Sequence, residues 1–360
     1  MHLFSPHVNL GLRNRSVMAP LTRFGCSVQG NPTSELADYY VRRADNDAGL
    51  IIVESCAINS SDAMGYRNGA QFHSQIHAEA WSKIVDQVHS CGAKIWVQLF
   101  HSGRLTVPEI SNGIPIAPSS IKPGDYPSYW RPKVNGAIVN FQTLTPYVSP
   151  KEMSLDDIEN VIADFENAVS LAESCGFDGV EIHGAHGYLV HSFLSRISNT
   201  RSDIYGLTNG HKFLETLVRR CRAILTKSTV LSFRCSVHMV DNPLIRFSSD
   251  ETEFHHIIPL LDKAGIDVFH SSEIDANKPL FGSKQTLHQI IRSNTSKPII
   301  ICGSIHSLEE ANNLIKSDNN ILIAFGRNFI SNPNLVRLLK DGQQDKIVKF
   351  EYNKHINVIF

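Results

Sequence analysis

The chain has 360 residues, which is enough for two ordinary domains or for one large α/β barrel. Lys plus Arg number 34 and Asp plus Glu number 35, so there is no basic field to attract nucleic acid or anionic lipid. Apolar residues make up 42% of the chain, yet the longest apolar runs are strand-length and far short of a membrane span. We expect no nucleic-acid or membrane partner, and any anionic ligand must be bound by a local site.

The cysteines and the first residues indicate the compartment. The seven cysteines are scattered and no two form a C-x-x-C pair, which argues against a zinc ribbon or a cysteine-ligated iron–sulfur cluster. An odd, scattered set is more typical of a reducing compartment than of a disulfide framework. The opening MHLFSPHVNLGLRNR holds no long apolar core, so we predict no signal peptide and expect a cytoplasmic protein.

Eight short apolar runs recur along the chain, and an amphipathic stretch follows most of them. Continuous apolar runs of this kind are typical of parallel strands that are buried on both faces. The runs are residues 15–23, 49–58, 94–101, 179–187, 229–237, 267–273, 297–305 and 320–329.

The clearest helical segments between these runs are residues 34–46, 78–92 and 154–176. The third opens on Ser154 with Asp157 three residues later, which resembles a capping box, and the second and third end at glycine. Alternating strands and helices predict a single α/β domain, a (β/α)₈ TIM barrel over residues 1–345 with a C-terminal tail at 346–360. A doubly wound open sheet is the alternative, but no G-x-G-x-x-G follows the first run.

The connection after the third strand is unusually long. Residues 102–153 are rich in Pro, Ser and Gly, and within them KVNGAIVNF places Asn-Gly between apolar residues, a β-hairpin signal. A long excursion at the C-terminal face of a barrel is usually a lid or a substrate loop. A tolerated surface insertion is the alternative interpretation.

Polar residues gather where the predicted strands end, which is where barrel active sites lie. Glycines at the ends of strands seven and eight would let backbone N–H groups approach an anion, and Arg327 adds a bidentate donor. Phosphate groups commonly bind at these two loops. A tight turn beside a surface arginine, with no ligand, is the alternative interpretation of the same residues. The residues of this predicted anion site are Gly303, Ser304, Gly326 and Arg327.

Gln98, Arg234 and Thr22 would converge inside a mostly apolar ring of strand ends. An amide, a guanidinium and a hydroxyl suit a flat heterocycle with N–H and C=O edges, and the cation could stabilise negative charge on it. Without such a ligand, Arg234 would be buried with no partner, whereas Gln98 and Thr22 could be satisfied locally by backbone groups.

His183 and His186 follow the fourth strand and could be zinc ligands, oxyanion donors or general acids. Zinc would need a third ligand such as His101 or Glu54, so hydrogen-bond donation is favoured and no metal is predicted. Tyr188 fits a general acid that protonates a carbon next to a carbonyl, although alone it reads as a core aromatic. We interpret His191 as structural.

Six stretches in this order resemble the old yellow enzyme family of FMN-dependent ene-reductases, from about residue 3 to residue 340. They are RSVMAPLTR, GLIIVES, WVQLFHSGR, EIHGAHGYLVHSFLS, LSFRCS and ILIAFGRNFISNPNLV. The resemblance implies a barrel that holds FMN non-covalently at its C-terminal mouth. It also implies that NADPH or NADH reduces the flavin in a ping-pong cycle and that an enone-type small molecule is the oxidant.

The resemblance also implies roles for individual residues. Pro20, Thr22 and Ser55 would lie along the flavin, Gln98 would bond its pyrimidine side, and Arg234 would stabilise the anionic reduced ring. Gly303, Ser304, Gly326 and Arg327 would bind the phosphate. His183 and His186 would hold the substrate carbonyl oxygen, and Tyr188 would donate the proton.

The chain departs from the family pattern in two places, YGLTNGHKF and the terminal EYNKHINVIF, and both bear on substrate choice. Two other functions are alternatives. A flavin-free phosphate-sugar barrel enzyme, such as an aldolase or isomerase, would explain the anion site but not Gln98 with Arg234, and no lysine ends a barrel strand. A non-catalytic flavin-binding protein would not need Tyr188. A homo-oligomer is compatible with the sequence.

Overall fold

The computed structural model describes residues 2–111, 113–124, 142–240 and 252–351, and the backbone of two short strands at 133–134 and 137–138. Residues 352–360 of the predicted tail lie outside the described part.

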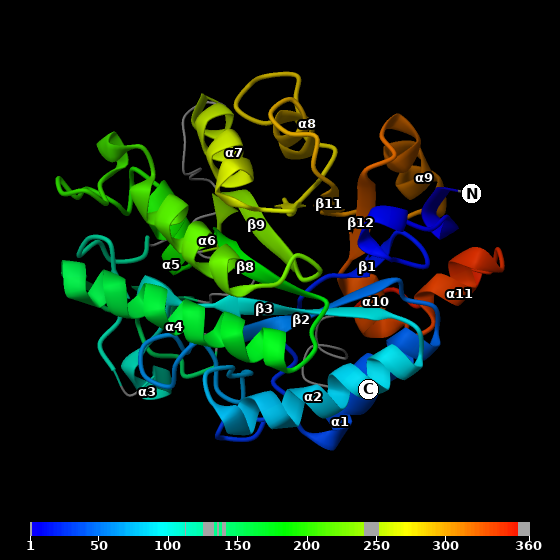
Figure 1. Ribbon diagram of the computed structural model, residues 1–360, viewed down its shortest axis with the longest axis horizontal. Helices are drawn as coiled ribbons and strands as arrows, with labels where there is room; N and C mark the ends of the chain where they lie inside the picture. Colours follow the sequence, from blue (N-terminus) through cyan, green and yellow to red (C-terminus); the bar gives the residue numbers. More distant parts are fainter. Residues whose placement is uncertain are drawn as a thin grey trace.

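Eight parallel strands form a closed barrel at the centre of the molecule (Figure 1). In spatial order they are β1 (Ser16–Met18), β12 (Ile321–Phe325), β11 (Ile299–Cys302), β10 (Val268–Ser272), β9 (Val230–Met239), β8 (Gly179–His186), β3 (Lys94–Phe100) and β2 (Leu50–Ala57). Each strand falls within, or within two residues of, one of the eight predicted runs. The predicted (β/α)₈ barrel is therefore confirmed, and the closed sheet excludes the doubly wound alternative.

Helices surround the strands (Figure 1). The α-helices are α1 (Ser34–Asp45), α2 (Gln75–Ser90), α3 (Pro108–Ser111), α4 (Leu155–Ser174), α5 (Leu189–Leu194), α6 (Lys212–Ile224), α7 (Thr252–Ala264), α8 (Leu287–Arg292), α9 (Leu308–Ser317), α10 (Arg327–Ser331) and α11 (Leu335–Lys340). Short 3₁₀ turns are η1 (His2–Phe4), η2 (Val8–Leu10), η3 (Gly103–Leu105), η4 (Leu207–Asn209) and η5 (Gln344–Lys346). Within the described residues, none of the helices combines the length and apolarity needed to cross a membrane.

Local sequence signals explain where the long helices begin and end. The Ser154 side chain accepts the Asp157 N–H at 3.0 Å, and the Asp157 carboxylate accepts the Ser154 N–H at 2.8 Å, so the predicted capping box of α4 is confirmed. Helix α2 begins at Gln75, three residues before the predicted start, because Ser74 caps it. Gly92 and Gly176 follow the two helices with φ of 75° and 80°, as a C′ glycine requires.

The eighth strand ends at the predicted glycine. Within the apolar run 320–329, β12 stops at Phe325, and a helix that was not predicted, α10, begins at Arg327. Gly326 interrupts the strand with a backbone conformation that belongs to neither element, and its carbonyl accepts the Phe329 N–H at 2.9 Å. The chain therefore turns into a helix directly at the mouth of the barrel.

Two apolar cores hold the barrel. The larger lies between the strands and the surrounding helices, and the smaller fills the barrel interior with Val17, Leu50, Ile52, Trp96, Val268, Ile300 and Leu322. A Cβ at Gly179 would lie 2.7 Å from the indole nitrogen of Trp96, so glycine is required beside this large ring. The packed interior leaves only the upper ends of the strands for a ligand.

The long excursion after β3 contains two small sheets. The strand β4 (Ile116–Ala117) pairs with β7 (Lys151–Glu152), and β5 (Lys133–Val134) pairs antiparallel with β6 (Ala137–Ile138). Val134 is in register with Ala137, as a two-residue Asn-Gly turn requires, while the turn residues themselves lie outside the described part. The hairpin strands are confirmed, and the lid role stays a prediction.

Candidate active site

The end of β8 brings His183 and His186 to the same side of the strand. Residues three apart on a regular strand point to opposite faces. Here the pairing with β9 shifts register between Gly184 and His186, and His186 has a left-handed φ of 64°. As a result, the two imidazole rings lie 5.4 Å apart, centre to centre.

Both imidazoles are held neutral. Burial, and then the charge of Arg234, lowers the pKa of His183 well below its usual range; burial, and then His238, does the same to the pKa of His186. The Nδ1 of His183 accepts the Ala185 N–H at 3.3 Å, so its ring proton lies on Nε2. His183 is therefore a neutral hydrogen-bond donor at the mouth.

Tyr188 completes a cluster of three rings. It directly precedes α5, it is 8% exposed, and its ring lies 4.9 Å from that of His183 and 4.6 Å from that of Phe100. Its hydroxyl is hydrogen-bonded to the hydroxyl of Tyr66. The sequence analysis missed Tyr66, which lies in the loop after β2 but well beyond the last residue of that strand, Ala57.

Tyr66 is fixed by aromatic packing. Its ring stacks on Phe100 at 6.1 Å and meets Phe24 edge-on at 5.9 Å. Tyr66 is more exposed than Tyr188, so the pair of hydroxyls leads from the buried cluster toward the surface.

Below the mouth, a set of buried polar side chains, here named the polar layer, spans four neighbouring strands. Its members are Gln98, Glu181, Ser232, Arg234 and His270, which are at most 6% exposed. The Glu181 carboxylate accepts hydrogen bonds from Gln98 Nε2 at 2.8 Å and Ser232 Oγ at 3.0 Å, and pairs with His270 Nδ1 at 2.8 Å. Glu181 and His270 were not predicted, although Glu181 precedes His183 by two residues and so faces the same way.

Arg234 and the two hydroxyls predicted to meet a flat ring lie around the upper edge of this layer. Arg234 donates to the Ser272 hydroxyl at 2.9 Å and to the Pro20 carbonyl at 3.4 Å, and the Thr22 and Ser55 hydroxyls are 3.3 Å apart. The Arg234 Nε is buried with no hydrogen-bond partner among the described residues. A buried N–H of this kind fits a ligand with acceptor atoms, and the pyrimidine edge of a flavin offers them.

The predicted anion site lies on two neighbouring strands, since Cys302 on β11 is in register with Ala324 on β12. Gly303 has a φ of 145°, and a Cβ there would lie 2.4 Å from the Glu273 carbonyl oxygen, so only glycine fits. The Ser304 hydroxyl donates to the Ile274 carbonyl at 2.7 Å, which leaves backbone N–H groups as the donors here. Arg327 is exposed beside Gly326.

The residues weighed as a third zinc ligand have other partners. His101 Nε2 lies 3.2 Å from the Asp62 carboxylate, and Glu54 accepts the Arg23 N–H at 3.1 Å. Burial raises the pKa of Glu54 to about 7. In the described part of the chain, no three His, Cys, Asp or Glu side chains are placed to hold a metal ion.

His191, interpreted as structural, is fully buried, and its Nδ1 accepts the Gly187 N–H at 2.8 Å. Burial lowers its pKa to about 3.

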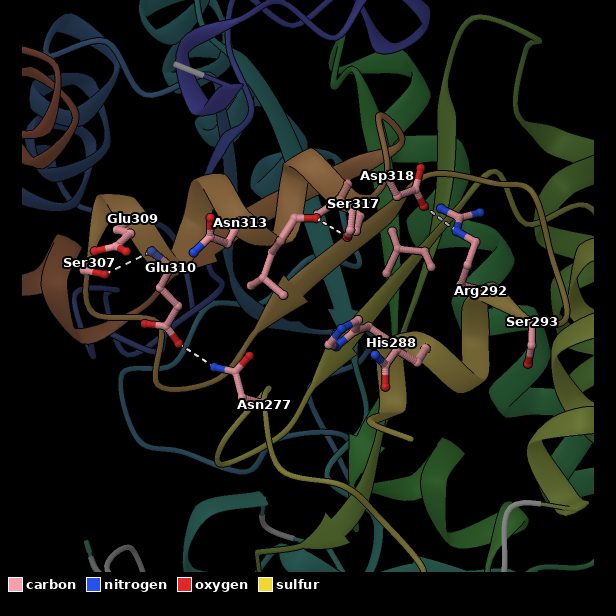
Figure 2. Close-up of a pocket in the computed structure, with 14 residues that line it drawn as sticks. Asn277, His288, Arg292, Ser293, Ser307, Glu309, Glu310, Asn313, Ser317 and Asp318 are labelled. Carbon is pink, nitrogen blue, oxygen red and sulfur yellow. Dashed lines mark hydrogen bonds and ion pairs between the residues drawn. The ribbon is translucent and has the colours of Figure 1, made fainter. Parts of the chain in front are cut away.

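A groove of about 710 Å³ lies elsewhere, on the outer side of the barrel between α8 and α9 (Figure 2). Asn277 donates to Glu310 and Arg292 pairs with Asp318 along its walls. None of the predicted site residues lines it, and a much smaller cavity beside Ser55, Tyr66 and Phe100 marks the mouth instead. We place the candidate site at the mouth because the converging polar groups lie there.

Comparison with known proteins identifies the class. A family model described as the NADH:flavin oxidoreductase / NADH oxidase family matches residues 2–346. An NADH oxidase of Thermoanaerobacter brockii is 30% identical over 353 residues, which cover 95% of this chain and 50% of that protein. The chain thus spans about half the length of that relative. An NADPH dehydrogenase of Clostridium acetobutylicum is 30% identical over 332 residues, with 91% of each chain covered.

Among solved structures, the old yellow enzyme homologue of Zymomonas mobilis superposes with a TM-score of 0.82 at 30% identity, covering 97% of this chain and 94% of that one. The chain therefore belongs to the NADH:flavin oxidoreductase / NADH oxidase family, the family of the old yellow enzymes. The resemblance stated from the sequence is confirmed, and the flavin-free barrel enzyme finds no support.

Proposed function

We propose that the protein uses non-covalently bound FMN to reduce the activated C=C bond of α,β-unsaturated carbonyl compounds, with NADPH or NADH as reductant, in a ping-pong cycle. The observation that carries this proposal is the cluster of His183, His186 and Tyr188 above the polar layer. Two neutral donors and one phenol in contact match what polarising and protonating an enone needs.

The cofactor would be held by three groups of residues. Thr22, Ser55 and the Pro20 backbone line one side, Gln98 and Arg234 offer donors from the polar layer, and the loops after β11 and β12 receive the phosphate. The loop residues are Gly303, Ser304, Gly326 and Arg327. When bound, FMN would supply the redox chemistry by accepting a hydride from the nicotinamide and passing it to the substrate β-carbon.

The two imidazoles would bind the substrate carbonyl oxygen. Because both rings are neutral, each carries one N–H without placing a buried cation at the mouth. His186 can offer its N–H from Nδ1 when its Nε2 accepts from the Ser272 hydroxyl, 3.1 Å away. Hydrogen bonds to the carbonyl oxygen stabilise the negative charge that builds there as the β-carbon is attacked.

Tyr188 would give its hydroxyl proton to the α-carbon. The Tyr66 hydroxyl, bonded to it and nearer to solvent, is the next group that can return a proton to Tyr188.

An anaerobic spectral titration tests this function. Purified protein is reconstituted with FMN, titrated with NADPH or NADH, and then mixed with 2-cyclohexenone. We expect the flavin band to bleach with the nucleotide and to return with the enone. Bleaching without return would contradict the substrate class, and failure to bind FMN would contradict the whole proposal.

A further inference from the structure

Glu181 and Arg234 have opposite charges and lie close together in the barrel interior, yet they form no ion pair. Glu181 is in register with Ser232 on β9, and Arg234 follows two residues later on the same inward face. A diagonal step of this kind is within reach of an arginine side chain. Among the described residues, the ion-pair partner of Glu181 is His270, while Arg234 reaches toward Pro20 and Ser272.

Three donors occupy the Glu181 carboxylate. Gln98 takes one oxygen, and Ser232 and His270 share the other. Burial alone would raise the pKa of Glu181, but the charge of His270, its hydrogen bond and the charge of Arg234 hold that pKa below its usual range. An ionised carboxylate without these donors would attract the nearest cation strongly, because a buried charge left unpaired is costly.

His270 is surrounded by charged and titratable groups on the two neighbouring strands and on β8, one strand further along the sheet. It faces Glu181 on β8, Arg234 on β9 and the Cys302 thiol on β11. Burial alone would lower the pKa of His270, but Glu181 raises it above its usual range. The Glu181 carboxylate therefore favours the protonated form of His270, and the imidazole is paired with Glu181 at 2.8 Å.

We propose that His270 is a positioning residue which occupies Glu181 and thereby keeps the Arg234 guanidinium available to a ligand at the barrel mouth. The observation that supports this availability is the buried Nε of Arg234, which has no hydrogen-bond partner among the described residues. For FMN as that ligand, the inference rests on the proposed function. It assigns no contact with the ligand to His270 itself.

His270→Leu tests the inference, because leucine fills similar space but donates no hydrogen bond. We expect Arg234 to turn to Glu181 and FMN to bind about 10- to 100-fold more weakly, the value of one charge-assisted hydrogen bond. His270→Gln keeps an N–H donor for Glu181 and should retain most of the affinity. The dissociation constant is measured by flavin fluorescence, and the flavin midpoint potential should fall in His270→Leu but not in His270→Gln.

The double variant His270→Leu/Glu181→Gln separates positioning from packing. Removing the carboxylate that captures Arg234 should restore FMN affinity toward that of the wild type. A purely structural role would instead make the two losses add, and that result would overturn the inference. His288→Leu is the matched control, since it removes another buried histidine outside the barrel, and urea unfolding of each variant reports the fold.

A crystal structure of His270→Leu decides the inference without flavin. An ion pair between Arg234 and Glu181 is expected, and Arg234 remaining on Pro20 and Ser272 would overturn it. If the wild type binds no FMN, the proposed function fails, and this structure still tests the position of Arg234.

Discussion

At the scale of single residues, the chemistry of the mouth depends on where protons reside. His183 has its proton on Nε2 because the Ala185 N–H occupies Nδ1, and burial keeps the ring neutral. Tyr188 contributes a phenol whose ring lies 4.9 Å from this imidazole. The division of labour between imidazole and phenol can therefore be tested one atom at a time.

Removing the Tyr188 hydroxyl should slow enone reduction without changing flavin reduction by NAD(P)H. We expect Tyr188→Phe to lower the rate of the enone half-reaction by about 10²- to 10⁴-fold, the usual contribution of a general acid. Stopped-flow measurement of the two half-reactions checks this. Tyr205→Phe removes a phenol away from the mouth and serves as the control, while equal losses in both half-reactions would reject the proton-donor role.

The sequence could predict the mouth residues because barrel strands end there, and a strand end can be recognised from the apolar run that precedes it. It could not predict Tyr66 or His270. Tyr66 reaches Tyr188 across 122 residues of chain, and His270 reaches Glu181 across 89 residues and over the intervening strand β9. Such partners follow from the closed sheet and not from any local pattern.

At the scale of elements, the loops after β11 and β12 form the proposed phosphate site from two adjacent strands. The backbone of Gly303 and the turn at Gly326 leave N–H groups at this edge, and the first residue of α10 adds a guanidinium. A binding site built mostly from backbone has few side chains to substitute, and Arg327 is the accessible one.

Arg327→Ala should weaken FMN binding by about tenfold, since an exposed charge-assisted hydrogen bond contributes toward the lower end of its range. Equilibrium titration of the flavin-free protein with FMN measures the dissociation constant. Arg42→Ala, at an exposed arginine of α1, is the matched control. The same dissociation constant in Arg327→Ala and the wild type would remove Arg327 from the phosphate site.

The strand and helix pattern was readable because strands buried on both faces form continuous apolar runs, and because Ser154 and two glycines mark helix ends. The end of β12 at Gly326 was predicted, but the helix α10 that begins directly after it was not. Phe329 is apolar and buried like the strand residues before it, but Gly326 lets the chain turn into α10. A single glycine can end a strand without interrupting the apolar pattern of the sequence, so the pattern alone does not show that a helix follows.

At the scale of the whole molecule, buried neutral histidines couple folding to pH. Burial lowers the pKa of His191 to about 3 and that of His288 to about 4, against about 6.5 when unfolded. Because the pKa of each histidine is lower in the folded state, the unfolded chain binds protons at a higher pH than the folded chain does as the pH falls. The stability from these residues is complete above pH 6.5 and is lost as the pH falls toward 4.

The free energy of unfolding should therefore decrease between pH 6.5 and 4, by about 1.4 kcal/mol per pH unit for each such histidine. His288→Gln removes one of these titrating groups, whose lowered pKa is caused by burial. It should therefore reduce the slope by about 1.4 kcal/mol per pH unit. Urea unfolding at a series of pH values measures the slope, with His306→Gln at an exposed site as the control. An unchanged slope in His288→Gln would contradict this account.

The pairing of β1 with β12 brings the first and last strands of the barrel side by side. Residues proposed to hold the flavin start at Pro20 and finish at Arg327, so the first of them is synthesised long before the last. A nascent chain that still lacks residues 303–327 has neither the closing strand nor the phosphate loops. If FMN binds as proposed, the complete site can form only after residue 327 has left the ribosome, and a chain stalled before β12 would be expected to be colourless.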